Sequence, residues 1–260
     1  MLLVKDIVNV IEDFAKPQYA YEWDNCGLCV GGMCDRVEAV LVALDCTKEV
    51  VEEAIERKCN LIITHHPLIF RGIKVATTDT AEGEIISLLY KNNISLYSAH
   101  TNLDIASGGV NDSLAKKLEL DDVTCFDSFE VDGKAVSCAR KGKLSKSKSG
   151  EEFVHFLKEK TGAVNVLTSG LKDCTVNTVA LSTGAGEEFG FKSDADVFVT
   201  GEIKYHTALE LKRRYIRFAA IGHYFSEVHF AQEFSKYLKD NFDDNIKVYT
   251  SKINTNPFDF

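Results

Sequence analysis

Short, mainly apolar runs separate the amphipathic stretches of this 260-residue chain. Three of these runs are followed closely by a short segment that contains histidine. The runs cover residues 61–63, 94–97 and 216–221. Runs of this length are typical of parallel strands that are covered on both faces. The segments that follow begin at Thr64, His100 and His223. Because open α/β sheets bind ligands beyond the carboxyl ends of their strands, we expect these histidines to meet in one site.

The first half of the chain alternates between strands and helices. Its first helix has apolar residues at helical spacing from Val4 to Phe14 and ends before Pro17. Strands are expected at residues 39–44, 61–63 and 94–98, and helices at residues 47–58, 82–91 and 110–118. This alternation predicts an α/β fold with a mainly parallel sheet.

The pattern changes near residue 124. Asp132-Gly133 lies between two short strand-like segments and predicts a hairpin turn. A basic, serine-rich stretch at residues 140–149 is expected to form an exposed loop before a helix at residues 151–160. The change in pattern suggests a domain boundary near residue 124.

The first half of the chain recurs in degenerate form in the second half. Residues 40–44 and 61–66 match residues 176–181 and 197–202, and the spacing of His100 and Asp104 matches that of His223 and Glu227. The alternative is a chance resemblance between two βα units, which share patterning anyway. A duplication predicts two similar α/β lobes, residues 1–124 and 125–260, with a metal site in the pseudo-symmetric cleft between them. The segment from about residue 228 could instead pack back on the first lobe.

Composition excludes several classes of protein. With 45% hydrophobic and 27% charged residues, the chain can bury a substantial core. No stretch approaches the roughly 18 consecutive apolar residues of a membrane span, and residues 1–6 lack the pattern of a signal peptide, so a cytoplasmic protein is expected. The net charge of −9 argues against broad binding to nucleic acid or to an anionic membrane. Local cations or bound divalent ions could still hold a small anionic substrate.

The eight cysteines are best interpreted as reduced thiols, because the chain is long and several of them lie within apolar runs. Cys26, Cys29 and Cys34 resemble half of a zinc site. No second Cys or His pair follows at the spacing of a zinc finger, which disfavours that alternative.

The strand-end residues suit a site for two metal ions. Imidazole and carboxylate ligands together favour zinc, iron, manganese, cobalt or nickel over calcium and magnesium. His65 and His66 at an irregular strand end can each serve one of two neighbouring ions, with Asp104, His223 and Glu227 as further ligands. Two such ions about 3.5–4 Å apart activate a shared water, which suggests a hydrolase.

Three more residues are candidates for supporting roles. Glu202 is a spare carboxylate and a candidate general base, and His206, one helical turn later, is a candidate helper. His100 could be either a metal ligand or its support. Structural alternatives exist, because a lone histidine is commonly a loop or capping residue. Asp104 could serve a turn, and Glu202 could favour a helix N-terminus.

Five motifs together resemble the NIF-three-like family, also called GTP cyclohydrolase I type 2 homologues. They are YEWDNCGL at 21–28, THHPLIF at 64–70, HTNLD at 100–104 followed by GGVND at 108–112, TGEIKYH at 200–206, and GHYFSE at 222–227. They run in the family's order from about residue 4 to 250. The chain resembles the short form of the family, which lacks the extra central domain of longer members. Tyr205 stands where the family often has a histidine.

This resemblance implies a two-lobed α/β subunit, a ring-shaped homohexamer and a dinuclear metal site. The family's metal ligands fall on His65, His66, Asp104, His223 and Glu227. The family name implies hydrolytic opening of a guanine nucleotide, and Arg71, Lys74 and Lys204 are either contacts for its phosphates or ordinary surface charges. The alternative is a non-catalytic metal-binding protein with an interaction or regulatory role.

Overall fold

The computed structural model describes residues 2–259, apart from the side chain of Asp244, and these form two compact units. The first unit extends to Ala106 and is completed by Phe230–Pro257. The second unit comprises Ser107–His229 and the last residues from Phe258. The sequence-based boundary at residue 124 lies inside the second unit, where the strand that contains it pairs with a strand of that unit. No helix among the described residues is long and apolar enough to cross a membrane.

The first unit is built on a five-stranded sheet in the order β15-β4-β5-β6-β2. Its strands are β2 (Gly27–Val30), β4 (Ala39–Ala43), β5 (Leu61–Thr64), β6 (Ser95–Ser98) and β15 (Lys247–Thr250). All neighbours are parallel except β2, which pairs antiparallel with β6. Every residue of β4, β5 and β6 is buried, as expected for strands with helices on both faces.

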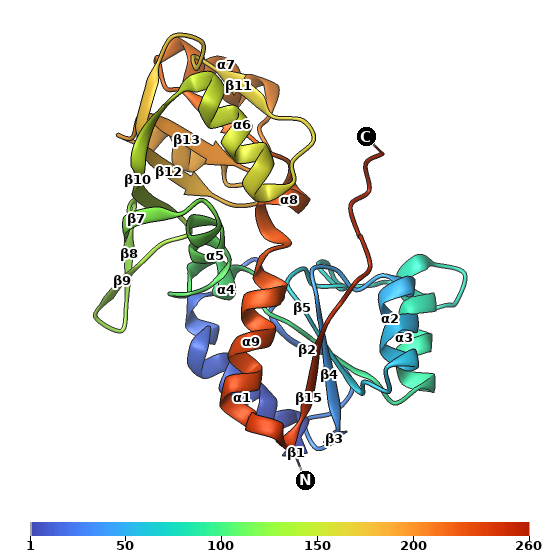
Figure 1. Ribbon diagram of the computed structural model, residues 1–260. Coiled ribbons are helices and arrows are strands. Elements are labelled where there is room, and N and C mark those ends of the chain that lie inside the picture. The colour runs from blue at the N-terminus through green and yellow to red at the C-terminus, as the bar shows by residue number, and fades with distance from the viewer. Residues whose placement is uncertain (1, 260) are drawn as a thin grey trace. The chain divides into compact units, whose positions relative to one another are not determined.

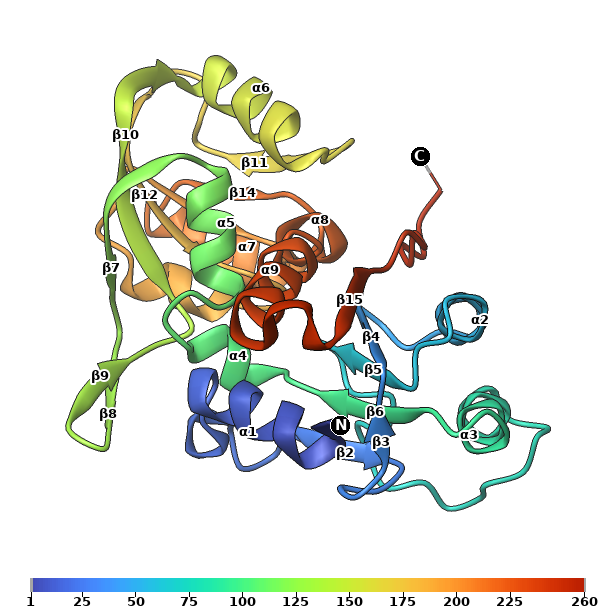
Figure 2. The same cartoon turned by 60° about the horizontal axis from the view of Figure 1, so that its bottom comes forward.

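Two pairs of helices cover the first sheet (Figure 1, Figure 2). One face carries α1 (Val4–Phe14) and α9 (Phe230–Phe242), and the other carries α2 (Lys48–Glu56) and α3 (Ala81–Lys91). The helix α1 buries the apolar stripe Val4, Ile7, Val8 and Ile11, which the sequence spacing predicted. Smaller elements are β1 (Leu2–Leu3) paired with β3 (Arg36–Val37), the 3-10 turn η1 (Pro17–Tyr19) and α4 (Thr101–Ile105); the turn η3 (Asp243–Asn245) precedes β15.

The second unit is built on a six-stranded sheet in the order β11-β14-β13-β12-β10-β7. Its strands are β7 (Leu120–Cys125), β10 (Arg140–Ser149), β11 (Leu167–Ser169), β12 (Thr175–Ser182), β13 (Val197–Thr200) and β14 (Phe218–Ala220). The central strands β12, β13 and β14 are parallel, and the other pairs are antiparallel.

Alternate residues of the second sheet enter two different cores. Val179 and Leu181 pack with apolar residues of α5 (Val110–Lys117) and α6 (Gly150–Thr161). Ala180, between them, packs with apolar residues of α7 (Tyr205–Arg213). This is the two-residue period of a strand covered on both faces. The remaining helical segments are η2 (Glu187–Lys192) and α8 (His223–Glu227).

The strand orders of the two units correspond, as the sequence repeat predicted. In the first sheet, the parallel strands β4, β5 and β6 are followed by the antiparallel edge strand β2. In the second, the parallel strands β12, β13 and β14 are followed by the antiparallel edge strand β11. The prediction of two similar α/β lobes on parallel strands is therefore confirmed.

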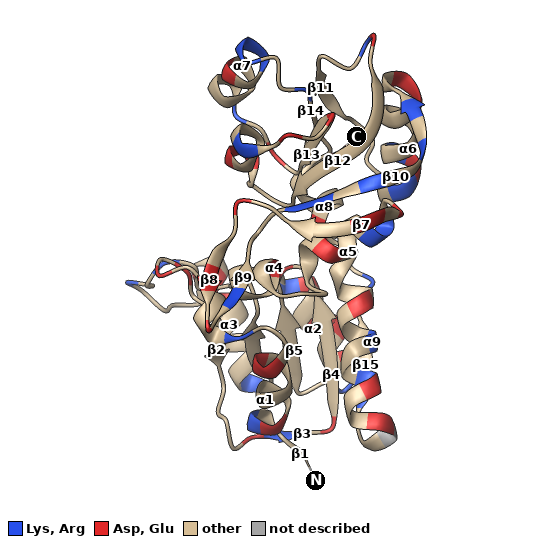
Figure 3. Cartoon of the chain, turned by 90° about the vertical axis from the view of Figure 1, so that its left-hand side faces the viewer, with Lys and Arg blue, Asp and Glu red and all other residues tan. Residues whose placement is uncertain are grey.

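The segment between α5 and α6 contains one confirmed prediction and one correction. The hairpin is present as β8 (Phe129–Val131) and β9 (Lys134–Val136), with positive φ at both Asp132 and Gly133. The prediction of an exposed loop at residues 140–149 was wrong, because this basic stretch is the strand β10 (Figure 3). Lys143 and Lys146 extend into solvent while the backbone of β10 pairs with β7 and β12.

Candidate metal centre

Three loops that carry histidines or a carboxylate lie at the carboxyl ends of the parallel strands in the first sheet. Ala43 of β4 pairs with Thr64 of β5, and Thr64 pairs with Ser98 of β6. The three strands therefore end at the same level, and Asp45, His65 and His66, and His100 follow directly. This is the edge at which open α/β sheets hold ligands.

Each histidine at this edge uses its Nδ1 atom to contact an oxygen acceptor. His65 Nδ1 lies 2.9 Å from the carbonyl oxygen of Ala99, and His66 Nδ1 lies 2.7 Å from Asp45 Oδ1. His100 Nδ1 lies 2.8 Å from Asp24 Oδ1. Because a carbonyl or carboxylate oxygen can only accept, each Nδ1 carries a proton and donates to its oxygen.

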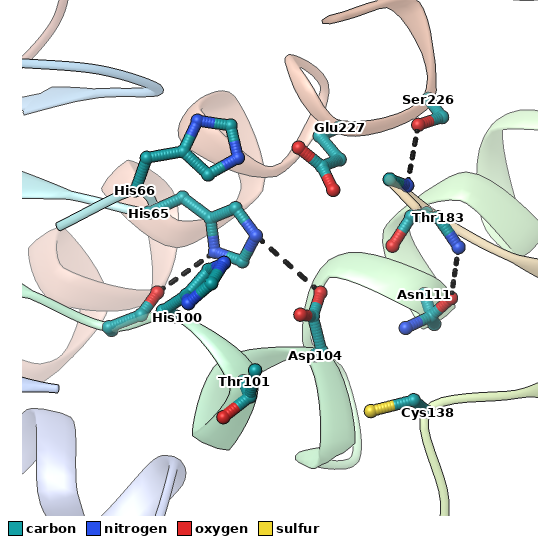
Figure 4. Close-up of polar contacts among 12 residues, drawn as sticks. His65, His66, His100, Thr101, Asp104, Asn111, Cys138, Thr183, Ser226 and Glu227 are labelled. Carbon is teal, nitrogen blue, oxygen red and sulfur yellow. Dashed lines mark hydrogen bonds and ion pairs between the residues drawn. The ribbon is translucent and has the colours of Figure 1, made fainter. Parts of the chain in front are cut away.

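The Nε2 side of His65 faces Asp104, whose Oδ1 atom lies 3.5 Å away (Figure 4). His65 is fully buried, between the ring of Phe230 at 5.3 Å and that of His100 at 5.1 Å between centroids. One ring nitrogen from each of His65, His66 and His100 lies within 4.8 Å of the others. The structure thus brings His100, which the sequence left as ligand or support, into the same group as the two predicted ligands.

Asp24 fixes the position of His100. Its carboxylate also accepts hydrogen bonds from the backbone N–H of Thr101 at 3.0 Å, from the Thr101 hydroxyl and from the Cys26 thiol. Burial alone would raise the pKa of Asp24, but the hydrogen bonds from His100, Thr101 and Cys26 hold it well below its usual range. Asp24 is therefore a permanent anion against the His100 ring. Burial, together with this anion, raises the pKa of Cys26 to about 12 and keeps its thiol protonated.

The second unit carries a matching histidine between two carboxylates. His223 Nδ1 lies 2.9 Å from Glu202 Oε1, and His223 Nε2 lies 3.0 Å from Glu227 Oε2. His223 and Glu227 stand at the two ends of α8, which starts just beyond β14. Glu227 is buried, whereas Glu202 is about half exposed. His223 and Glu227 are thus placed as the sequence spacing requires of two ligands on one face.

Gly184 makes room for this pair. A Cβ atom at position 184 would lie 2.3 Å from Glu227 Oε1 and 3.2 Å from His223 Nε2, and the residue has a φ of +57°. Its N–H donates to Ser226 Oγ at 3.0 Å, and its carbonyl accepts from the N–H of Glu202 at 2.8 Å. The glycine therefore helps to frame the pair formed by His223 and Glu227.

The remaining candidates lie apart from these groups. His206 is exposed on the first turn of α7, where its ring contacts that of Tyr205 at 5.3 Å between centroids. Arg71 and Lys74 are exposed, and Lys204 Nζ lies 3.2 Å from Glu187 Oε1. Among residues 2–259, the groups of side chains able to hold an ion include neither His206 nor any cysteine.

Comparison with known proteins identifies the family. The model of the Duf34/NIF3 (NGG1p interacting factor 3) family matches residues 2–257. The chain belongs to this family. It is 36% identical to a Clostridium perfringens protein named "GTP cyclohydrolase 1 type 2 homolog", with 99% of each chain covered. A protein of the same name from Clostridium acetobutylicum is 33% identical, with 100% of this chain and 99% of the relative covered. The resemblance indicated by the motifs is confirmed.

Solved structures of Duf34/NIF3 relatives share the fold. A Staphylococcus aureus protein matches with a TM-score of 0.93 and 29% identity, over 100% of this chain and 99% of that chain. A Bacillus cereus protein described as related to NIF3 matches with a TM-score of 0.94 and 26% identity, over the same shares. Reduced HcgD from Methanocaldococcus jannaschii matches with a TM-score of 0.79 and 27% identity, over 97% and 98%.

Sequence reasoning missed Asp24 and Asp45, the two carboxylates that hold His100 and His66. Asp45 carried a usable signal, because it follows β4 at the same sheet edge as the predicted ligands. Asp24 gave no such signal, because it does not follow a strand. It lies before β2, and its contact with His100 is visible only in the folded structure.

Replacing Asp45 with alanine is expected to weaken metal binding by about 10- to 100-fold, because His66 loses the acceptor that fixes its ring and tautomer. Isothermal titration with Zn²⁺ or Mn²⁺ measures this change. The exposed Glu52 on α2 provides the control, and Glu52→Ala should bind like the wild type. Equal affinities for Asp45→Ala and the wild type would contradict the prediction.

Proposed function

We propose that this protein is a metal-dependent hydrolase with two divalent ions per subunit. His65, His66 and Asp104 of the first unit and His223 and Glu227 of the second would be the ligands, with His100 beside them. The observation that supports the proposal is that four histidines have Nδ1 held by an oxygen acceptor, while the Nε2 atoms of His65 and His223 are directed at the carboxylates of Asp104 and Glu227. This is the usual arrangement of metal-binding imidazoles in proteins. The donor set suits zinc, iron, manganese, cobalt or nickel.

The residues also fit the chemistry of the ions. Bound in pairs, divalent ions lower the pKa of a shared water towards neutrality and polarise the bond that it attacks. Glu227 and His65 are each buried, so each of these side chains is shielded from bulk water within its own unit. The space that Gly184 leaves open in front of Glu227 and His223 would be filled by any side chain.

Glu202 has two candidate roles. Its Oε1 atom holds His223 Nδ1, so it positions that ring. Its half-exposed carboxylate could also take a proton from the attacking water, as the sequence analysis proposed. His206, exposed on the next helical turn, would at most relay that proton to solvent.

The substrate that we propose is a purine nucleotide, opened at its imidazole ring with release of formate. The names of the relatives support this choice, since two proteins that match nearly the whole chain are named "GTP cyclohydrolase 1 type 2 homolog". Arg71 and Lys74 are exposed and available for phosphates, whereas Lys204 is in contact with Glu187. We also propose the homohexameric ring that the family resemblance implies.

The test combines metal analysis with product analysis. Anaerobically purified protein should contain near two ions per subunit and should release formate from GTP. Glu202→Gln keeps an oxygen acceptor for His223, so metal content should persist. A general base at this position predicts a loss of rate of at least tenfold at saturating metal, and a purely positioning role predicts an unchanged rate.

The second candidate is a non-catalytic metal-binding protein that interacts with or regulates a partner. The family description, which names an interacting factor, favours it. Full metal occupancy without turnover of any nucleotide would support this candidate over the hydrolase. Variants of the ligands that lose a catalytic rate but keep partner binding would exclude it.

A further inference from the structure

Three aromatic side chains of the first unit lie together beside His100. Tyr21 and Trp23 stack with ring centroids 5.5 Å apart and an interplanar angle of 18°. Phe70 meets Trp23 edge-on at 5.9 Å. Both Trp23 and Phe70 contact the His100 ring, at 6.4 and 6.1 Å between centroids. We call Tyr21, Trp23 and Phe70 the aromatic wall.

Two side chains of the aromatic wall are exposed to solvent, although hydrogen bonds fix the loops that carry them. Trp23 and Phe70 are 60% and 45% exposed. Single exposed apolar residues are ordinary, but an exposed cluster next to a polar site commonly marks a binding surface. The two loops that carry the wall are joined by a hydrogen bond from the Asn25 side chain to the carbonyl oxygen of Ile69. The backbone N–H of Tyr21 donates to Thr101 Oγ1 at 3.1 Å, on the residue next to His100.

We propose that the aromatic wall binds the planar heteroaromatic base of the substrate by stacking. Every nucleobase has a π-face, and stacking on an aromatic side chain contributes about 1–3 kcal/mol per base. The His100 ring contacts the wall and belongs to the histidine group, so a stacked ring lies next to that group. Arg71 follows Phe70 directly and is exposed, which places a cation beside the wall for a phosphate. The choice of a purine rests on the proposed function; the stacking of a planar ring does not.

A small ring suits this surface better than a protein does. Stable interfaces between proteins bury about 800 Å² on each partner, which far exceeds the area that two partly exposed rings offer. The rings meet one another stacked or edge-on, and they border a cluster of polar ring nitrogens. Ligand sites generally combine such aromatic surfaces with a few convergent polar groups.

The only tryptophan of the chain, Trp23, allows a direct test by fluorescence. Guanosine added to the metal-loaded protein should quench this fluorescence with saturation, and ribose 5-phosphate, which has no base, should leave it unchanged. Phe70→Ala should weaken guanosine binding by roughly tenfold or more, and Phe70→Leu, which keeps apolar volume without a π-face, should weaken it comparably. Tyr215→Ala, at a 92% exposed aromatic residue of the second unit, is the matched control and should bind like the wild type.

The outcomes separate this inference from the proposed function. Saturable quenching without turnover of GTP or any other nucleotide would support base stacking on the aromatic wall and would overturn the proposed hydrolase. Formate release from GTP together with equal guanosine affinity in the wild type, Phe70→Ala and Phe70→Leu would contradict base stacking on the aromatic wall. The proposed hydrolase would still stand. A change in Trp23 emission with protein concentration alone, and none with guanosine, would assign the surface to contact between copies of the chain and would also overturn the inference.

Discussion

His65→Ala is expected to lower metal affinity by more than about 100-fold, which is beyond the loss produced by removing a supporting carboxylate. His65 is fully buried, its Nδ1 is fixed by the carbonyl oxygen of Ala99, and its Nε2 faces Asp104. In the proposed site, the substitution therefore removes a ligand atom from a fully buried position. Metal content of the purified protein and calorimetric titration with Zn²⁺ or Mn²⁺ measure the effect.

The control for this substitution is His155→Ala, at an exposed histidine of α6. It should keep the metal content and affinity of the wild type. Circular dichroism shows whether His65→Ala keeps its fold. A folded His65→Ala protein with unchanged metal affinity would contradict both the prediction and the assignment of the site.

Asp112→Ala is expected to lower the free energy of unfolding of the second unit by about 3–5 kcal/mol, because it leaves a buried charge without its counterion. Arg140 is 2% exposed, and its Nε and Nη2 atoms lie 2.7 and 3.0 Å from the two carboxylate oxygens of Asp112. This two-point contact connects β10 to α5. Urea unfolding followed by far-UV circular dichroism is the measurement, since the only tryptophan lies in the first unit.

An exposed ion pair on the same strand gives the contrast. Lys143 Nζ contacts Asp122 at 3.0 Å, with both side chains more than 60% exposed. Lys143→Ala should change the free energy of unfolding by less than about 1 kcal/mol. A loss for Asp112→Ala as small as that for Lys143→Ala would show that the buried pair is not a major source of stability.

The main strands and helices were predictable because they depend on the pattern of apolar residues within each segment. Residues 39–44 and 61–63 are apolar without interruption, residues 94–98 are apolar apart from two serines, and the structure buries β4, β5 and β6 completely. The edge strand β2 was missed, because its position depends on pairing with β6 rather than on its own pattern. The strand β10 was misread, because its exposed lysines and serines resemble those of a loop although its backbone pairs with β7 and β12.

The part of the candidate site that lies directly after the strands was predictable from the sequence. His65, His66 and His100 follow neighbouring parallel strands, so topology alone brings them together. The contacts that orient them were not predictable in the same way. Asp24 reaches His100 across 76 positions of sequence, and the space in front of Glu227 exists only because residue 184 has no side chain.

The order of the chain through the two units has a consequence for synthesis. The first sheet is completed by β15, which pairs in parallel with β4 although about 200 residues separate them. Domains emerging from a ribosome generally fold as units, starting from the N-terminus. Here most of the second unit, Ser107–His229, is available before α9 and β15 have been made. We therefore expect the second unit to fold before the first sheet is complete, because one side of β4 stays unpaired until β15 has been synthesised.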